Sequence, residues 1–525
     1  MLKIRLEELL DVLGGKLLSQ TPAVNRRGVL QYAPTDLEGV SIDSRTLNKG
    51  NIFFAIKGEN LDGHNFVSQA IGKGASAVVI TESKGGDFTP IALDSVPFIL
   101  ISDSKKALQG LALWYRKKFS PKVIAVTGTN GKTTTKDMIA SVLAKKYKVL
   151  KSPKSYNNQI GLPLTLFQLN PEIEVIVVEL GTSNLGEIGN LTQIALPDVG
   201  VITNIGPAHL ETFGSLERIA KTKFELLDEM SFDGISVLNI DDKLIQKRAK
   251  KEKRKNLTYA LKNEADYQAT DIKFSDDGFV SFSVNSSGVS IFRLTRGKAK
   301  ALHSKGSTSA TFDKSFGQKF PVHLKLLGEH NVYNALAAFV CGELLGVERE
   351  KIKQALEEYT PSELRMELVK IGGITIINDS YNANPVSMRN ALLTLKRMEN
   401  RGRKAAVLGD MLELGEKEID FHKEIGRFVA SSKLDLLLTI GKLSNFIASE
   451  AKNSGMDSKN IISFHNNSDL RSYLKENLVD GDLILVKGSR KMKLEEVVKN
   501  LKNYSTVRTR CNVPLPKETD PPKAE

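Results

Sequence analysis

Cysteine is almost absent from this chain. Only Cys341 and Cys511 occur in 525 residues, far apart and without the paired spacing of a zinc site. A framework of several disulfides is excluded by the same count. We therefore expect two free thiols in a reducing compartment.

Long apolar runs are also missing. No segment approaches the roughly 20 apolar residues that a membrane-spanning helix needs. The N-terminus carries Glu7, Glu8 and Asp11 where a signal peptide needs an unbroken apolar stretch. We expect a cytoplasmic protein without a membrane span.

Aromatic residues are sparse, at 6%, and the most basic part of the chain has none. Residues 243–255 contain eight Lys or Arg and one Glu, so this run holds a net +7 of the total charge of +13. Without aromatic side chains between the cations, the run cannot stack on bases, and it is typical of a solvated helix face. We expect no nucleic acid partner, although a positive surface also attracts anionic nucleotides.

What the chain does contain is the composition of a folded protein, with 41% apolar and 26% charged residues. Its length predicts two to four domains. Apolar runs without polar alternation, such as Val123–Val126 and Val175–Val178, predict parallel strands that are buried on both faces. Residues 279–284 alternate apolar and polar side chains, which predicts antiparallel strands.

A glycine-rich turn follows the strand Val123–Val126. The sequence Gly128-Thr129-Asn130-Gly131-Lys132-Thr133 joins this strand to a helix that we expect to begin at Lys132. Backbone N–H groups of such a turn bind phosphate, the lysine adds a positive charge, and the threonine hydroxyl can ligate Mg²⁺. Only two residues separate the two glycines, whereas the usual loop has four. The strand–turn–helix context nevertheless favours a phosphate-binding loop over an accidental glycine turn.

These patterns predict an α/β fold of three domains. A small α/β domain covers residues 1–115, and a central parallel sheet with the phosphate-binding loop covers 116–358, including an antiparallel β insertion at about 265–325. A Rossmann-like α/β domain covers 359–505. The proline-rich residues 506–525 predict a disordered tail.

Three further residues stand near predicted strand ends or on a helix. Glu179 ends the strand Val175–Val178, at the edge of the sheet where ligands bind in α/β folds, so it is placed to hold Mg²⁺. Taken alone, it is an ordinary strand-end acid. His209 follows a third strand and is a candidate for a second metal, although a lone histidine is more often structural. Lys223 lies on a helical pattern, and its chemistry alone predicts an exposed lysine.

Together these residues resemble the Mur ligases of peptidoglycan synthesis, over a region from about residue 40 to about residue 500. Each motif is modest, but their joint order is specific. The additional motifs that carry the resemblance are Ser155–Pro163, Gly328–Ala335, Asn378–Pro385, Leu408–Gly415 and Val486–Arg490.

The resemblance implies an ATP-driven amide synthesis assisted by Mg²⁺. A peptide carboxylate takes the γ-phosphate of ATP, and an amine attacks the resulting acyl phosphate. The implied substrates are UDP-N-acetylmuramoyl-tripeptide and D-alanyl-D-alanine. The first domain would bind the UDP-sugar, the second the phosphates, and the third the adenosine and the dipeptide. We expect a monomer.

The resemblance also assigns catalytic and metal-binding roles. Lys132, Lys223 and His209 are the expected catalytic residues. Lys223 matches the lysine that is carbamylated in Mur ligases, a change that converts a cation into an anion that can help to hold metal. The expected metal-binding residues are Thr133, Glu179, His209 and Lys223, and the expected ATP loop consists of Gly128, Thr129, Asn130, Gly131, Lys132, Thr133 and Thr134.

The remaining assignments concern the nucleotide and the two substrates. Asn331 and Asn334 are expected on the adenine side of ATP, Arg365 at its phosphates, and Asp379 and Tyr381 over the nucleotide. The residue before Arg365 is Leu364, where the family usually has glycine. The substrate-binding residues are expected to be Ser44 and Arg45 for the UDP-sugar, Asn157 and Asn158 for the muramoyl peptide, and Lys487, Ser489 and Arg490 for the dipeptide carboxylate.

Three alternatives remain open at this point. Two are other members of the superfamily, namely the ligase that adds the third peptide residue and a folylpolyglutamate synthase. The motifs Asn378–Pro385 and Leu408–Gly415 favour the dipeptide-adding ligase instead. The third is a nucleotide-binding regulator without ligase activity, which Glu179, His209 and Lys223 argue against. The sequence leaves the third residue of the tripeptide open.

Overall fold

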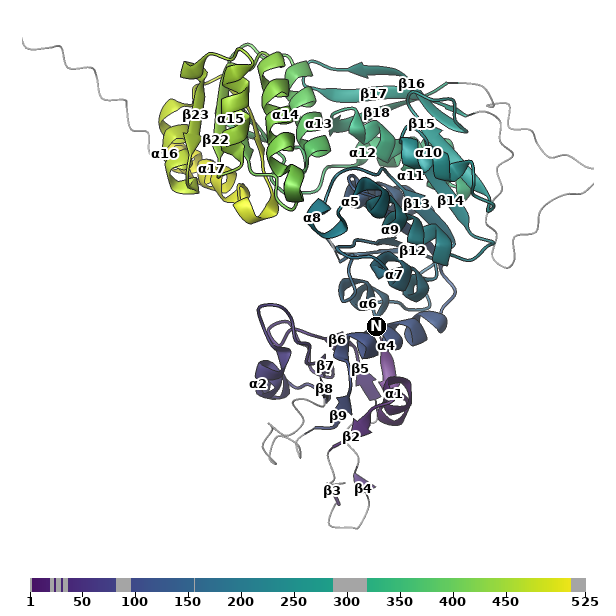
Figure 1. The fold of residues 1–525 in the computed structure, drawn as a ribbon. Coiled ribbons are helices and arrows are strands. Elements are labelled where there is room, and N and C mark those ends of the chain that lie inside the picture. The colour runs from purple at the N-terminus through teal and green to yellow at the C-terminus, as the bar shows by residue number, and fades with distance from the viewer. Residues whose placement is uncertain are drawn as a thin grey trace, which may run out of the picture.

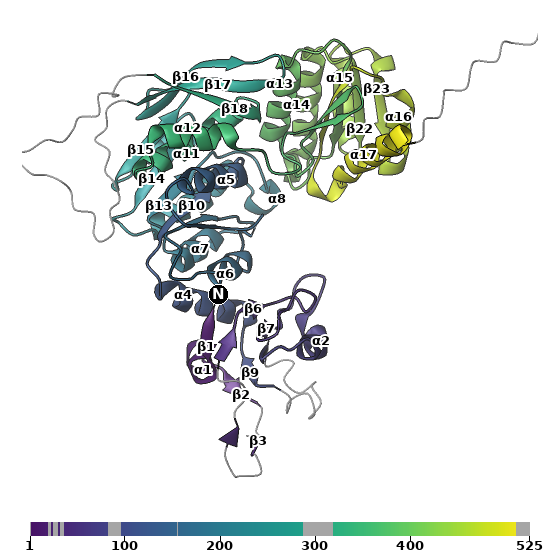
Figure 2. The same cartoon turned by 180° about the vertical axis from the view of Figure 1, so that it is seen from behind.

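Three sheets with helices on their faces make up the structure, a computed structural model that describes residues 2–18, 23–24, 30–31, 36–81, 96–154, 156–286 and 319–510. The N-terminal sheet lies below the central one, and the C-terminal sheet lies beside the central one (Figures 1 and 2). The predicted α/β class with parallel-rich sheets is confirmed. Within the described residues, no helix is long and apolar enough to cross a membrane.

The N-terminal sheet has five strands in the order β2-β9-β8-β7-β6, parallel except for the edge strand β2. Its strands are β2 (Lys16–Leu17), β6 (Val40–Ser41), β7 (Ile52–Phe54), β8 (Ala77–Thr81) and β9 (Phe98–Ile101). Around it lie β1 (Lys3–Arg5) paired with β5 (Asp36–Glu38), the short pair β3 (Ala23–Val24) and β4 (Leu30–Gln31), α1 (Leu6–Leu13), η1 (Gly63–Phe66), α2 (Val67–Gly72) and α4 (Ser104–Lys117).

Helix α4 joins this domain to the central one. Asp103 caps it by accepting hydrogen bonds from two backbone N–H groups. Leu108 and Leu111 pack in one continuous core with Phe54 of the N-terminal sheet and Leu162 of the central domain. The two domains therefore share buried apolar surface through this helix.

The central sheet has nine strands in the order β11-β12-β10-β13-β14-β15-β16-β17-β18. The first seven run parallel, and β17 pairs antiparallel with both of its neighbours, β16 and β18. The strands are β10 (Lys122–Thr127), β11 (Val149–Lys151), β12 (Val175–Glu179), β13 (Val199–Ile202), β14 (Ile235–Asn239), β15 (Asn256–Ala260), β16 (Tyr267–Phe274), β17 (Phe279–Ser286) and β18 (Phe320–Leu327). The helices are α5 (Lys132–Leu143), α6 (Gly161–Leu166), α7 (Glu187–Ala195), α8 (Leu210–Phe213), α9 (Leu216–Glu229), α10 (Lys243–Ala249), α11 (His330–Leu344) and α12 (Arg349–Glu358).

The predicted insertion is thus the antiparallel end of the main sheet. Strands β16, β17 and β18 alternate buried and more exposed side chains, because one face packs on α11 and α12 and the other faces outward. Residues 287–318 of that segment lie outside the described part of the chain.

Strand β10 shows why the central apolar runs lack alternation. Val123 and Ala125 point into the core on the side of α7 and α9, whereas Ile124 and Val126 point into the core on the side of α5 and α11. Since both faces are covered, each side chain is buried. Burial of one full-sized aliphatic side chain stabilises the fold by about 1.5–3 kcal/mol. Because β10, β12 and β13 run parallel, their carboxyl ends lie at the same edge of the sheet.

The C-terminal sheet has six strands in the order β19-β20-β24-β21-β22-β23, all parallel except β19. The strands are β19 (Glu367–Ile371), β20 (Ile374–Asn378), β21 (Lys404–Gly409), β22 (Leu436–Ile440), β23 (Ile461–Phe464) and β24 (Leu483–Lys487). The helices are α13 (Pro385–Arg397), η3 (Gly415–Lys417), α14 (Glu418–Ser431), α15 (Ser444–Asn453), η4 (Ser458–Asn460), α16 (Asn467–Asn477), η5 (Arg490–Met492) and α17 (Glu495–Arg510).

Two sequence predictions, the C-terminal tail and the free cysteines, can be compared with the structure. Helix α17 continues to Arg510, five residues into the segment predicted as a tail, and residues 511–525, with Cys511, lie outside the described part. Cys341 is a free, buried thiol on α11, and its burial raises its pKa.

Candidate active site at the domain junction

The glycine-rich loop has the backbone that only glycine adopts without strain. Gly128 and Gly131 have φ values of +144° and +79°. A Cβ atom at Gly128 would lie 2.0 Å from the Thr203 hydroxyl, and one at Gly131 would lie 2.4 Å from the Asn334 side-chain oxygen. The loop therefore turns tightly against β13 and α11, and α5 begins directly after it at Lys132.

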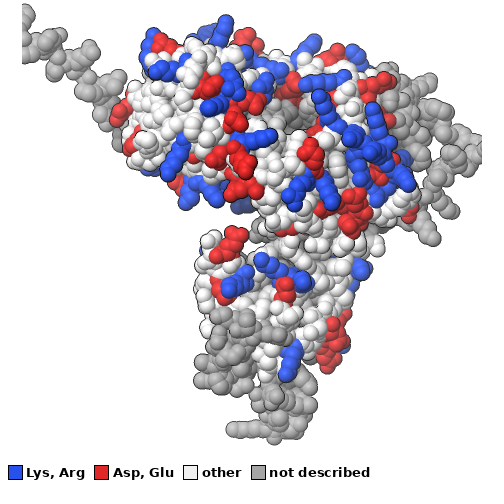
Figure 3. All heavy atoms as spheres, in the orientation of Figure 1, with Lys and Arg blue, Asp and Glu red and all other residues white. Residues whose placement is uncertain are grey.

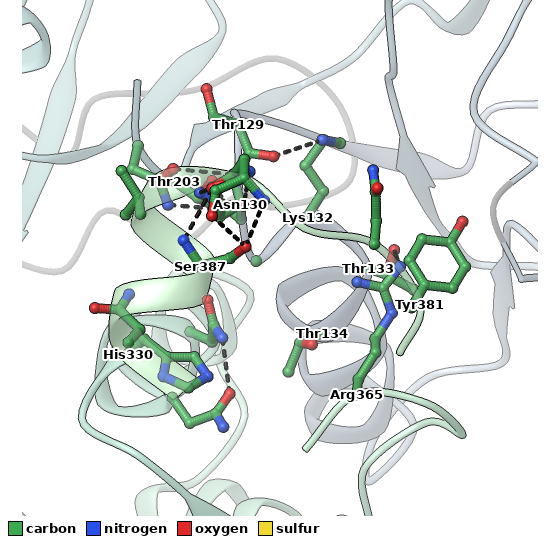
Figure 4. A pocket seen from close by; sticks show the side chains of 18 of the residues that line it. Thr129, Asn130, Lys132, Thr133, Thr134, Thr203, His330, Arg365, Tyr381 and Ser387 are labelled. Carbon is green, nitrogen blue, oxygen red and sulfur yellow. Dashed lines mark hydrogen bonds between the residues drawn. The ribbon is translucent and has the colours of Figure 1, made fainter. Parts of the chain in front are cut away.

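Lys132 is folded back over its own loop. Its ammonium donates hydrogen bonds of 3.0 Å to the carbonyl oxygens of Gly128 and Thr129. Figure 4 shows the bond to Thr129. Burial lowers the pKa of Lys132, and the nearby carboxylate of Glu179 acts in the opposite direction. A lysine next to the N–H groups of a helix start is suited to a phosphate group.

The metal-ligand types also come together beside this loop. The Thr133 hydroxyl donates a 2.7 Å hydrogen bond to one oxygen of Glu179, which is 2% exposed at the end of β12. The Asn157 amide donates a 2.7 Å bond to the other oxygen. Within the described residues, no group of three or more His, Cys, Asp or Glu could hold a metal ion. One hydroxyl and one carboxylate suit Mg²⁺, which takes its other ligands from phosphates and water.

His209 and Lys223 lie close to this centre. His209 begins α8 with a φ of +53°, and its Nδ1 lies 2.5 Å from a carboxylate oxygen of Glu413 in the C-terminal domain. Burial lowers the pKa of His209, and the Glu413 carboxylate acts against that effect. Lys223 is 4% exposed on the inner face of α9, so the expectation of an exposed lysine from chemistry alone was wrong. Burial, and then the positive charge of Lys132, hold the pKa of Lys223 well below its usual range.

The C-terminal domain reaches into the same site with Arg365. Its guanidinium donates a 3.1 Å hydrogen bond to the Thr133 hydroxyl and stacks 3.9 Å from the ring centre of Tyr381 (Figure 4). Asn130, at the tip of the loop, exchanges amide hydrogen bonds with Asn384, the N-cap of α13. Both contacts connect the phosphate-binding loop to the third domain.

A cavity of about 440 Å³ lies between these two domains. Most of the predicted residues line it, and Gly128, Lys223, Ser44, Arg45, Asn158, Ser489 and Arg490 do not. The predicted residues that line it are Thr129, Asn130, Gly131, Lys132, Thr133, Thr134, Asn157, Glu179, His209, Asn331, Asn334, Arg365, Asp379, Tyr381 and Lys487.

Two buried asparagines of α11 line this cavity. Asn331 donates to the carbonyl oxygen of Leu327 and accepts a 2.9 Å hydrogen bond from Asn334. Asn334 in turn accepts a 3.0 Å bond from the Thr135 hydroxyl on α5. The Thr135–Asn334 bond joins α5 to α11. The contact of both asparagines with adenine stays a prediction.

Lys487 is engaged within the third domain. It is 2% exposed, and its ammonium lies 2.6 Å from the Asp379 carboxylate and 2.9 Å from the carbonyl oxygen of Asn382. Its charge is therefore compensated, and its visible task is to fix the loop after β20. Ser489 accepts a 2.9 Å hydrogen bond from Leu412, and the exposed Arg490 pairs with Glu495 at 2.9 Å.

The residues predicted for the UDP-sugar follow β6 in the N-terminal domain and do not line this cavity. The Ser44 hydroxyl donates a 2.7 Å hydrogen bond to Gln69, and Arg45 pairs with Asp43, which lowers the pKa of Asp43 to about 2. A cavity of about 350 Å³ between the N-terminal and central domains includes Asp43 and Tyr156 in its lining. Asn158 is committed to the start of α6, where it accepts two backbone hydrogen bonds.

Sequence reasoning missed two parts of the site. Asn384 stood only as part of the motif Asn378–Pro385, although a capping residue one position before Pro385 predicts a helix start. Glu413 was visible as an acid between two leucines in the motif Leu408–Gly415, but no spacing pairs it with His209. Both contacts cross a domain boundary.

The fold and the site together define a nucleotide-phosphate-binding enzyme whose third domain reaches into the phosphate site. Three family models match the chain: the Mur ligase family catalytic domain at residues 36–116, the Mur ligase middle domain at 126–342, and the Mur ligase glutamate ligase domain at 364–490. The chain belongs to the Mur ligase family.

Individual relatives make the comparison more specific. The chain is 39% identical over 472 residues, 90% of this chain and 94% of the relative, to the UDP-N-acetylmuramoyl-tripeptide–D-alanyl-D-alanine ligase of Bacillus subtilis strain 168. It is 30% identical to the enzyme of the same name from Escherichia coli K12, covering 96% of this chain and all of that protein. Among solved structures, MurF from Acinetobacter baumannii superposes with a TM-score of 0.78 at 26% identity, covering 96% and 99% of the two chains. MurF from Thermotoga maritima in complex with ADP superposes with a TM-score of 0.73 at 27% identity, covering 90% and 98%.

Leu364 offers a stability prediction. It has a φ of +64°, in the left-handed region that costs a residue with a side chain about 1 kcal/mol. We expect Leu364→Gly to raise the free energy of unfolding by about 1 kcal/mol, measured by urea denaturation. The control is the neighbouring Glu363, which is not among the described residues of positive φ. Glu363→Gly should lower the free energy of unfolding. An equal loss in both variants would contradict the strain argument.

His422 predicts a pH dependence of folding. It is fully buried, its Nε2 accepts a 3.0 Å hydrogen bond from the Met411 N–H, and its Nδ1 lies 2.6 Å from the carbonyl oxygen of Glu418. Only the neutral ring satisfies both contacts, and burial lowers its pKa below 6.5. The unfolded chain therefore binds the proton more readily, so the free energy of unfolding should fall as the pH drops below about 6.5.

The measurement is the urea midpoint between pH 7.5 and 5. His422→Gln should lower stability and reduce the pH slope, because glutamine does not titrate. The exposed His465 is the control, and His465→Gln should leave the slope unchanged. An unchanged slope in His422→Gln would show that other groups carry the acid sensitivity.

Proposed function

We propose that this chain is an ATP-dependent ligase that joins D-alanyl-D-alanine to UDP-N-acetylmuramoyl-tripeptide. The products are the UDP-linked pentapeptide, ADP and phosphate, a step of peptidoglycan precursor synthesis. The observation that carries the proposal is the meeting of Lys132, Thr133 and Glu179 with Arg365 of the third domain in one cavity. The 39% identity to an enzyme of this name over 90% of the chain supports it.

The chemical task is to bring two anions together and to make a carboxylate electrophilic. Lys132 swings from its loop carbonyls to the β- and γ-phosphates, and the free N–H groups at the start of α5 hold the phosphate oxygens. Arg365 contributes a second cation from the opposite side of the cavity. Both charges offset the repulsion between ATP and the tripeptide carboxylate.

Magnesium fits beside these groups. Thr133 and Glu179 would hold one ion, and His209 with a carbamylated Lys223 would serve a second. Bound there, Mg²⁺ would neutralise charge on the transferred phosphoryl group. Asn157 orients Glu179 through its 2.7 Å hydrogen bond, which links the peptide-facing loop to the metal-facing carboxylate.

The other predicted residues take substrate-positioning roles in this proposal. Asp379 and Tyr381 close over the nucleotide, with Asn331 and Asn334 on its adenine side. Ser44 and Arg45 hold the UDP-sugar. Each lies 2.7 Å from its own partner, Gln69 for Ser44 and Asp43 for Arg45. Lys487 supports the dipeptide site by fixing the loop of Asp379 and Asn382, with Ser489 and Arg490 beside it. The ATP and UDP-linked substrates place the reaction in the cytoplasm, and we propose a monomer.

A substrate panel tests the function. Phosphate release should require ATP, Mg²⁺, a UDP-tripeptide and D-alanyl-D-alanine together, and UDP-tripeptides ending in lysine or in a diamino acid should be compared. Removal of Mg²⁺ by chelation should abolish the release. Release that proceeds with a single amino acid and UDP-dipeptide, but not with D-alanyl-D-alanine, would assign the chain to an earlier step. Release independent of any amine would exclude ligase function.

A further inference from the structure

A second, smaller cavity opens beside the phosphate site. It lies between the central domain and three loops of the C-terminal domain, and four residues line both cavities: Ala208, His209, Asn382 and Asn384. A molecule in the smaller cavity would therefore have one end next to the groups that handle the phosphates. The remaining residues of its lining are Ala383, Leu412, Glu413, Ser489, Arg490 and Lys491.

The lining of this cavity carries charges of both signs. Glu413 is the only carboxylate of its lining, and Arg490 and Lys491 supply positive charge from the loop after β24. Arg490 already pairs with Glu495, at 55% side-chain exposure, and Lys491 is exposed. A pocket lined by one acid and two cations matches a small zwitterion whose ammonium and carboxylate are a few bonds apart.

The backbone holds Glu413 firmly in this place. Its φ is +65°, a conformation that a glutamate adopts only when its surroundings impose it. Its carbonyl oxygen accepts a 3.2 Å hydrogen bond from Glu211 of the central domain. The N–H groups of the two preceding residues are bound by His422 and Ser489.

We propose that Glu413 binds the ammonium group of the incoming amine substrate and holds it beside the acyl phosphate. The ammonium releases one proton to solvent before its nitrogen attacks the acyl carbon, and phosphate leaves. This rests on the proposed ligase function. Its carboxylate contacts Nδ1 of His209 at 2.5 Å, and a substrate ammonium takes the place of that N–H group in the complex. Arg490 and Lys491 attract the substrate carboxylate at the other end. The carboxylate thereby selects a zwitterionic amine over a neutral one.

The test is Glu413→Gln, which keeps the shape and removes the charge. We expect KM for D-alanyl-D-alanine to rise about 10- to 100-fold, the loss of one charge-assisted contact, with the KM values for ATP and UDP-tripeptide unchanged. Hydroxylamine, an uncharged amine at neutral pH, should trap the acyl phosphate as hydroxamate at the wild-type rate in this variant. Glu416→Gln, an exposed acid three positions further on that lines neither cavity, is the matched control and should behave as wild type.

The two readouts separate the possible failures. A rise of less than threefold in KM for the dipeptide would overturn the role of Glu413. Loss of hydroxamate formation in Glu413→Gln would also overturn it, because Glu413 would then act through His209 on acyl-phosphate formation. Failure of the wild-type protein to form hydroxamate from ATP and UDP-tripeptide would instead reject the proposed function itself.

Discussion

Replacing Lys132 by alanine should lower kcat for phosphate release by about 1,000-fold. One preorganised charge at a developing anion contributes about 100- to 1,000-fold in enzymes, and Lys132 lies next to the helix start that receives the phosphates. Within the described part of the chain, the ammonium of Lys132 bonds to its own loop, at the carbonyl oxygens of Gly128 and Thr129. The fold should therefore survive the change, with a loss of about 1 kcal/mol or less in the free energy of unfolding.

Steady-state kinetics measure the fall in kcat, and urea denaturation of the same preparation measures the free energy of unfolding. Lys148→Ala removes a surface lysine that pairs with Glu172 at 3.0 Å, and it should leave kcat unchanged. Binding of the UDP-tripeptide, measured by calorimetry, should persist in Lys132→Ala. A kcat within tenfold of wild type would show that the loop does not handle the transferred phosphate.

Replacing Lys223 by alanine should have the second largest effect, a fall of about 100-fold or more in kcat. Lys223 is buried on α9, and burial together with the charge of Lys132 favours its uncharged amine. An uncharged amine adds CO₂ and loses a proton to give a carbamate. That anion would stand near Lys132 and help to hold a metal ion, so its formation removes a clash between two cations.

Carbon-13 NMR of the protein in labelled bicarbonate should show a carbamate signal that Lys223→Ala lacks. Removing bicarbonate from the buffer should lower the activity of the wild type. Lys221→Ala, on the exposed side of the same helix, is the matched control and should keep both the signal and the activity. Full activity in Lys223→Ala, with no response to bicarbonate, would reject the carbamate.

Several features followed from local sequence because short-range physics controls them. The strand–turn–helix around Gly128 and Gly131 could be predicted, since the two glycines are required by a turn that leaves no room for a Cβ atom. Glu179 was placed correctly at a strand end, because a parallel strand buried on both faces ends where its apolar run ends. The roles of these residues in the reaction remain proposals.

Other features depend on contacts between segments that are distant in the chain. The burial of Lys223 was not predictable from its own chemistry, because the packing of α9 on α7 and on the sheet decides which side of the helix is inside. Lys487 was expected at a substrate carboxylate, yet it lies 2.6 Å from Asp379, more than a hundred residues away. Periodicity carries no information about such a pair.

The sequence by itself determined the α/β class, the buried strands and the phosphate-binding loop, because apolar periodicity and glycine conformation act over a few residues. Only the tertiary structure decided which side chains of the third domain contact the central domain. Arg365 contacts Thr133, Asn384 contacts Asn130, and Glu413 contacts His209. The physical reason is that each of these contacts joins chain segments more than 200 residues apart. Their geometry is set by how two separately packed cores meet at the cavity.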